Sequence, residues 1–325
     1  MTKYYCWLIG SSGSGKTTVI DKKIADILGC ECKNNDIYSH DIDVLVETLS
    51  VFRESVFKYI YTCMNEKWNI ICHSNIIIPE KHNLNSLLEA NNDLIYYIDE
   101  FTNKMSEEYL VSRYLVNNSK LNSIRDKIQK NTKIITNGTT GAGITKDISR
   151  LFYSGMNYGI PGDTNLAVSS GYEIVYIFVY CPLTVCIERT IKRSINKFKK
   201  LIPYKSYEES INSNESAPCL VTIWDPDFES LYFNYSPFSL VGQREKIIGN
   251  IKNFIKQKNV IIVYNGDDDR SHIIYKKMDS TVTVNIINNQ AEMANVLHNY
   301  KNRVDDTEYS VVLKELHDIK EFTKL

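Results

Sequence analysis

The distribution of apolar and polar positions along the chain predicts strands separated by helices. Short runs rich in β-branched and aromatic residues are expected to form strands at Tyr4–Ile9, Lys133–Thr136, Tyr172–Tyr180 and Val260–Tyr264. The run at Tyr172–Tyr180 is apolar throughout, which predicts a central parallel strand covered on both faces. Helical spacing follows the first run, over residues 18–28. This order predicts an α/β fold in which helices flank a parallel sheet.

Between the first strand and residue 130 the pattern is less regular. Asp36 to Asp41 is predicted as a short second strand, and residues 51–66 and 105–130 as helices. Two further apolar runs, Asn69–Ile78 and Leu94–Asp99, are interpreted as strands, with a short helix around residues 84–88 between them. The stretch 69–100 therefore looks like an insertion into the α/β pattern.

The second half of the chain contains two predicted helices, one insertion and a change of pattern. One helix is expected to begin near Leu183, and the other to cover residues 241–257. The irregular, aromatic-rich stretch 203–240 is interpreted as a second insertion. From residue 271 onward, two strand-like runs at Ile273–Lys277 and Thr281–Ile287 precede helical patterns at 291–302 and 308–321. We therefore expect a main domain over residues 1–270 and a small α+β appendage over 271–325, which is a candidate site for a protein partner.

Composition and charge exclude several classes of protein. The net charge of −1 gives no overall basic field that would attract nucleic acid or an anionic membrane. No signal peptide or membrane-spanning run is evident, and the eight cysteines contain no C-x-x-C pair. We expect reduced thiols, no membrane association and a cytoplasmic location, in the producing cell or in a cell that receives the protein.

The stretch Gly10-Ser11-Ser12-Gly13-Ser14-Gly15-Lys16-Thr17 fits the phosphate-loop (Walker A) pattern G-x-x-x-x-G-K-[ST] at every fixed position. It lies between a predicted strand and a predicted helix, which is the context that this motif requires. Together with Thr18, these residues are predicted to bind the phosphates of ATP through backbone N–H groups at the start of the helix. Lys16 would reach the β- and γ-phosphates, and the Thr17 hydroxyl would ligate Mg²⁺. The alternative is a Ser/Gly-rich turn that matches by chance.

Asp41 is the first candidate for a catalytic base, and Asp43 is the second. A carboxylate at the end of the second strand can orient an acceptor hydroxyl and take its proton. The alternative is that either residue caps the helix that follows.

The helix beginning near Leu183 has one strongly basic face. Arg189, Arg193 and Lys197 recur at every fourth position, and arginines in such a row can stabilise the charge on a phosphoryl group during transfer. Arg189 and Arg193 are therefore candidate catalytic residues. The alternative, which we favour for Lys199 and Lys200, is a solvated basic face.

Other polar positions are given structural interpretations. His73 is expected to be a core residue, and the carboxylates of Asp99-Glu100 and Asp267–Asp269 are expected to lie in turns. The glycine-rich stretch Asn137–Gly143 either approaches a ligand through its backbone or is a plain loop.

The order of these motifs resembles the zeta-toxin and polynucleotide-kinase branch of phosphate-loop kinases. The matching pieces cover about 265 residues with gaps; they are Gly10–Thr18, Tyr38–Asp41, Ile135–Thr139, and Gly171-Tyr172 through Cys181–Leu183 to Glu188-Arg189 and Arg193. The resemblance implies a five-stranded parallel core, ATP as donor, Asp41 as base and Arg189 or Arg193 as lid arginines. This chain departs from the pattern at Val44, where the branch often has arginine, and at Asn137, where a Walker B carboxylate is absent. Ile70–Asn75 is an alternative third strand.

The leading hypothesis is therefore an ATP-dependent phosphotransferase. It would move the γ-phosphate to a hydroxyl of a small metabolite, a nucleotide or nucleotide sugar, or a nucleic-acid 5′ end. The alternative is a nucleotide-binding switch or interaction module without kinase activity. A GTPase is disfavoured, because Asn196-Lys197-Phe198-Lys199 lacks the aspartate of the guanine-reading motif.

Overall fold

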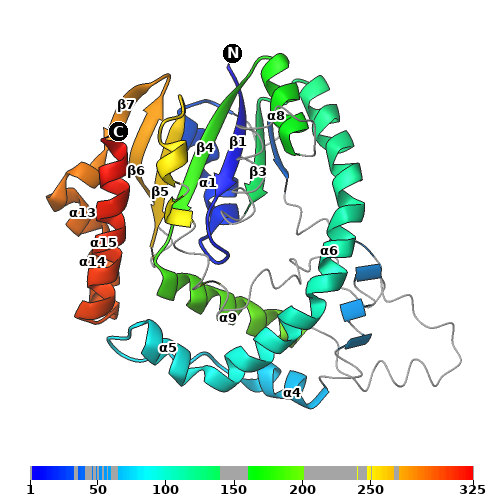
Figure 1. The fold of residues 1–325 in the computed structure, drawn as a ribbon, viewed down its shortest axis with the longest axis vertical. Helices are drawn as coiled ribbons and strands as arrows, with labels where there is room; N and C mark the ends of the chain where they lie inside the picture. The colour runs from blue at the N-terminus through cyan, green and yellow to red at the C-terminus, as the bar shows by residue number, and fades with distance from the viewer. Residues whose placement is uncertain are drawn as a thin grey trace, which may run out of the picture.

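The structure is a computed structural model, shown in Figure 1, and all structural statements below concern the residues that it describes. These are residues 2–32, 36–40, 46, 49, 51–52, 55–56, 58–59, 65–139, 160–200, 240, 247–249, 251–266 and 271–324. Asp41, Asp43 and Asp267–Asp269 lie outside them, as do residues 140–159 and 201–239.

The centre of the fold is a seven-stranded sheet in the order β2-β3-β1-β4-β5-β6-β7. The first five strands in this order are parallel, whereas β6 and β7 continue the sheet in antiparallel fashion beyond β5. The bounds are β1 Lys3–Ile9, β2 Ile37–His40, β3 Ile134–Thr139, β4 Tyr172–Tyr180, β5 Val260–Asn265, β6 Ser271–Met278 and β7 Thr281–Asn285. The predicted parallel arrangement therefore holds for five strands, and β4 is the middle strand of the sheet.

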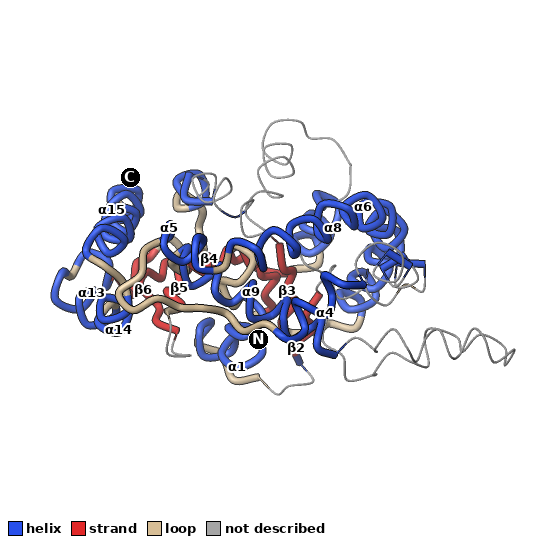
Figure 2. The backbone as a smooth tube through the Cα atoms, turned by 90° about the horizontal axis from the view of Figure 1, so that it is seen from below, coloured by secondary structure: helices blue, strands red, loops and turns tan. Residues whose placement is uncertain are grey.

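Helices cover both faces of this sheet, so the prediction of an α/β fold is confirmed. Figure 2 shows α1 on one side of the strands and α8 on the other. The helices are α1 Lys16–Leu28, α4 Asn65–His73, α5 Leu84–Ala90, α6 Asn92–Gln129, α8 Ile160–Ser169, α9 Leu183–Lys200, α13 Gln290–Val296, α14 His298–Arg303 and α15 Asp306–Thr323, with a 3-10 turn at Ile286–Asn288. Within these described helices, none has both the length and the apolar character required to cross a bilayer.

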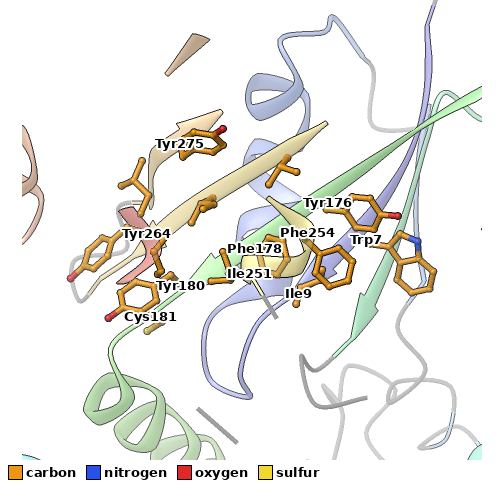
Figure 3. Close-up of a cluster of buried hydrophobic side chains, with 14 of the residues drawn as sticks. Trp7, Ile9, Tyr176, Phe178, Tyr180, Cys181, Ile251, Phe254, Tyr264 and Tyr275 are labelled. Atoms are coloured by element: carbon orange, nitrogen blue, oxygen red, sulfur yellow. The ribbon is translucent and has the colours of Figure 1, made fainter. Parts of the chain in front are cut away.

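Successive side chains of β1 point to opposite faces of the sheet, so they contribute to different hydrophobic clusters. Cys6 and Leu8 are buried in one hydrophobic cluster together with apolar residues of α1. Tyr5, Trp7 and Ile9 are buried in the other cluster, with residues of the C-terminal half of α6, of α8, and of α13 to α15. Figure 3 shows part of this second cluster, in which the rings of Phe178 and Phe254 pack in a tilted arrangement with centroids 5.4 Å apart.

Two predicted strands are helical, so those two predictions were wrong. Residues 69–73 of the first run lie in α4 and residues 74–78 form no strand, and Leu94–Asp99 lies in the first turns of the long helix α6. In α6 the buried positions recur with helical spacing from the first turn onward, which the six-residue window Leu94–Asp99 is too short to reveal; they are Leu94, Ile95, Ile98, Phe101 and Met105. The alternative third strand at Ile70–Asn75 is therefore also wrong, because β3 is the neighbour of β1.

Several smaller expectations change with these helices. His73 lies at the exposed end of α4 and is not a core residue. Asp99 and Glu100 lie within α6 and not in a turn; Glu100 forms an ion pair with Lys67 at 2.7 Å. The predicted helix at 84–88 is confirmed as α5.

Residues 271–324, here called the C-terminal segment, are built into the same architecture. The hairpin of β6 and β7 extends the sheet, and buried residues of α13 to α15 belong to the cluster that contains β4 and β5. In Figure 1, α13 to α15 lie beside β5 and β6. The division into a main domain and an appendage stays a prediction, although the sheet itself runs across the proposed boundary.

Candidate functional site

The loop between β1 and α1 has the local geometry of an anion-binding turn. Ser12, Gly13 and Ser14 are buried, and the Ser14 amide donates to the carbonyl of Ser11 at 3.2 Å. Gly15 is the N-cap of α1, with φ 81° and ψ 27°, and as a glycine it has no side chain to cap the helix. The N-cap residue therefore gives the first N–H groups of α1 no side-chain acceptor of the kind that Ser, Thr, Asp or Asn supplies at this position. The buried Ser14 hydroxyl likewise has no hydrogen-bond partner among the described residues.

Two glycines of the loop leave no room for a side chain. Gly13 has φ +76°, and a Cβ there would lie 2.4 Å from the carbonyl oxygen of Cys186 on α9. At Gly15 a Cβ would lie 2.1 Å from the side-chain nitrogen of Asn265. The loop is thus packed by backbone contact against α9 and against the end of β5. Neither distance is compatible with a larger residue unless the loop moves.

The Lys16 ammonium group lies over the loop. Its Nζ donates to the carbonyl oxygens of Gly10 and Ser11, each at 2.9 Å. Thr17 is exposed in the first turn of α1, and the side chain of Thr18 is outside the described atoms. Within the described part of the chain, no group of three or more His, Cys, Asp or Glu side chains is arranged to hold a metal ion.

Arg189 on α9 reaches the loop between β1 and α1, whereas Arg193 does not. The Arg189 guanidinium donates to the carbonyl oxygen of Gly13 at 3.4 Å, to the Cys181 sulfur at 3.5 Å and to the carbonyl oxygen of Gly266. Arg193, one turn further along α9, is exposed and makes no hydrogen bond to the described residues. The structure therefore brings together the loop, Lys16 and Arg189, and leaves Arg193 facing solvent.

Asn265 is a site residue that sequence reasoning missed. It is the last residue of β5, its side chain is buried, and its Nδ2 donates to the Ser14 carbonyl at 2.7 Å. The adjacent Gly266 accepts the bond from Arg189, so the end of β5, α9 and the loop form one connected set of contacts. Nothing in the local sequence indicates that the Asn265 side chain bonds a loop residue 251 positions away.

The predicted acceptor side is only partly described. β2 ends at His40, which lies opposite Asn137 of β3, and β3 is parallel to β1. The carboxyl end of β2 therefore lies at the same edge of the sheet as the loop between β1 and α1. Asp41 and Asp43 follow in the sequence but fall outside the described residues, so the assignment of a base stays a prediction. In β3, Asn137 is buried and its Nδ2 donates to the hydroxyl of Tyr5 at 3.1 Å.

Comparison with known proteins gives no matching family model and no match among curated sequences. Two similar solved structures are complexes of AvrRxo1-ORF1 with AvrRxo1-ORF2, each 12% identical and covering 100% of this chain and 81% of that chain. The one with sulphate ions has a TM-score of 0.37, and the one with ATP has a TM-score of 0.33.

Proposed function

We propose that the protein is an ATP-dependent phosphotransferase of the phosphate-loop kinase type, related to the zeta-toxin and polynucleotide-kinase branch. The acceptor is a hydroxyl of a small metabolite, a nucleotide or nucleotide sugar, or a nucleic-acid 5′ end. The observation that carries the proposal is the loop Gly10–Thr17 itself. It joins a parallel strand of the sheet to a helix whose N-cap is a glycine in the left-handed conformation, and Lys16 lies directly over it.

The loop supplies what a triphosphate requires. A phosphate oxygen is stabilised by N–H groups at a helix N-terminus and by the positive end of the helix dipole. The Lys16 ammonium, which bonds two loop carbonyls, is close enough to exchange them for β- and γ-phosphate oxygens. Two hydroxyls add further polar groups to the phosphate site: that of Ser14, which is buried, and that of Thr17, which is exposed in the first turn of α1. In this proposal Thr17 is the protein ligand of Mg²⁺, which neutralises charge on the phosphates.

The transfer step assigns a role to each remaining residue. The acceptor oxygen bonds to the γ-phosphorus, the bond from that phosphorus to the β–γ bridging oxygen breaks, and ADP leaves. The acceptor proton passes to the carboxylate of Asp41. Arg189 lies at the loop, and Arg193 is the arginine that can swing over the transferred group, because no described contact holds it.

Binding and transfer are tested separately. Calorimetry with ATP, GTP and Mg²⁺ should detect binding to the wild type, and Lys16→Ala should lose it. Lys23→Ala, a change on the same helix, should bind as the wild type does. Thr17→Ala should bind ATP with a weaker dependence on Mg²⁺.

Transfer is then measured as ATP consumption against metabolite pools and a 5′-hydroxyl oligonucleotide. Asp41→Asn should lose transfer and keep binding, and full activity in Asp41→Asn would exclude Asp41 as the base. Absence of any nucleotide binding at millimolar concentrations would overturn the whole proposal.

A second candidate function is a nucleotide-dependent switch without transfer. One observation favours it: the Arg189 guanidinium is already engaged by the Gly13 and Gly266 carbonyl oxygens, which is a structural use of that side chain. Tight ATP binding with no transfer to any acceptor pool, unaffected by Asp41→Asn, would support this function.

A further inference from the structure

A buried ionic cluster lies on the side of α9 that faces away from the phosphate loop. The carboxylate of Glu188 is 2% exposed. One guanidinium nitrogen of Arg303, from α14, contacts both of its oxygens, at 2.8 and 2.7 Å. The imidazole of His82, also 2% exposed, places Nε2 at 3.1 Å from Glu188 and Nδ1 at 3.1 Å from the carbonyl oxygen of Pro79. Lys192 approaches from the solvent side at 3.8 Å.

The cluster holds its carboxylate in the charged form. Burial by itself raises the pKa of Glu188, but the hydrogen bond from His82 and the charge and hydrogen bond of Arg303 outweigh that effect, so the pKa lies below its ordinary value. A buried carboxylate that loses one partner is left uncompensated, which makes such a cluster intolerant of small displacements.

The C-terminal segment is anchored to α9 and to residues 79–86 by further bonds. The Thr184 hydroxyl contacts the Tyr300 hydroxyl at 2.9 Å, and that phenol donates to Glu308 at 3.2 Å. The backbones of His82 and residues 303–305 exchange two hydrogen bonds, at 3.2 and 3.1 Å. Residues 79–86 and the C-terminal segment, which are distant from each other in the sequence, therefore converge on α9.

Two opposite faces of α9 contact different parts of the protein. Thr184 and Glu188 are one turn apart and face the C-terminal segment. Cys186 and Thr190, also one turn apart, are the nearest neighbours of the position that a Cβ on Gly13 would take. Since successive residues turn by about 100°, the two pairs lie roughly 200° apart on the helix. α9 is thus held between the C-terminal segment and the phosphate loop.

We propose that Glu188 is a positioning residue for the nucleotide site: by fixing α9 to Arg303 of the C-terminal segment, it holds the opposite side of α9 against the phosphate loop. The contact with the loop is backbone to backbone, so a shift of α9 moves the Cys186 carbonyl, the Arg189 guanidinium and the loop together. The C-terminal segment is then part of the nucleotide site, although none of the contacts described above places its residues at the loop. The effect on nucleotide affinity rests on the function proposed above, whereas the effect on the loop does not.

The test uses the full chain and two readouts. Amide hydrogen exchange of residues 10–17 without nucleotide reports the loop directly, and calorimetry reports the affinity for ATP, both at a temperature where every variant is folded. Arg303→Ala should speed exchange in the loop and weaken ATP binding about tenfold. Arg303→Lys should recover part of both effects. Asn302→Ala, the neighbouring change on α14, should alter neither.

A double-mutant cycle tests whether the effect passes through Glu188. Glu188→Gln keeps the shape of the side chain, and in that background Arg303→Ala should add little to either readout. If Arg303→Ala does not fold, Glu188→Gln and Arg303→Lys carry the same test.

Two results would overturn the inference. One is a lower melting temperature in the Arg303 variants with unchanged loop exchange and unchanged ATP affinity, which a merely stabilising contact would give. The other is an undiminished effect of Arg303→Ala when Glu188 is already glutamine. If the wild type binds no ATP, the proposed function fails, and loop exchange still decides the role of Glu188.

Discussion

Replacing Gly13 by alanine should destabilise the protein in two ways, through backbone strain and through overpacking against α9. Gly13 has φ +76°, and the added Cβ would meet the Cys186 carbonyl oxygen at 2.4 Å and the Thr190 hydroxyl at 3.0 Å. Gly171 is a matched control, because it has φ +79° but nothing within 4 Å of the added Cβ. The strain of a positive φ costs about 1–2 kcal/mol for a non-glycine residue and is common to both variants. Overpacking adds a further ~1–3 kcal/mol, and only Gly13→Ala should show it.

We therefore expect Gly171→Ala to lower the free energy of unfolding by about 1–2 kcal/mol and Gly13→Ala by about 2–5 kcal/mol. Urea denaturation measures both, provided that the slope of the unfolding free energy with urea is unchanged. Gly13→Ala should also weaken ATP binding, whereas Gly171→Ala should not. Equal losses of stability in the two variants, with unaltered nucleotide affinity, would show that the loop and α9 are not in the close contact described.

Two further predictions concern single side chains. Asn265→Ala removes the buried donor to the Ser14 carbonyl, so it should lower the free energy of unfolding by about 1–3 kcal/mol and also weaken ATP binding. The control Asn259→Ala removes bonds at the opposite end of β5 and should reduce stability alone. Equal ATP affinities in the two variants would refute a role of Asn265 at the loop. The pKa of the Glu188 carboxyl is lowered in the folded protein, so its contribution to stability is present at neutral pH and is lost as pH falls from the ordinary value of 4.5 through the lower folded value. Arg303 stays charged over that range, so the difference in unfolding free energy between the wild type and Glu188→Gln should shrink on acidification. A difference that does not depend on pH would contradict the charged cluster.

Local sequence signals predicted the elements that build the site, but not the contacts that hold them. Tyr172–Tyr180 was identified as a strand because nine consecutive positions suit a strand that is buried on both faces. The loop was identified because glycine, lysine and threonine occur at a spacing with one chemical use. Asn265 and Glu188 gave no such signal, since their partners are 251 and 115 positions away. The first turns of α6 resemble a strand in the sequence, because the five apolar residues Leu94–Ile98 fit both the strand period and the helix period, and only the full helix distinguishes the two.

The position of β1 has a consequence for how the protein is made. This strand is translated before both of its neighbours, and Ile9 pairs with Thr139 on one side and with Phe178 on the other. At 5–20 residues per second, a ribosome needs roughly 10–35 s to supply the second partner. Until then β1 lacks its β4 partner, so the central part of the sheet can be completed only after more than half of the chain has been synthesised.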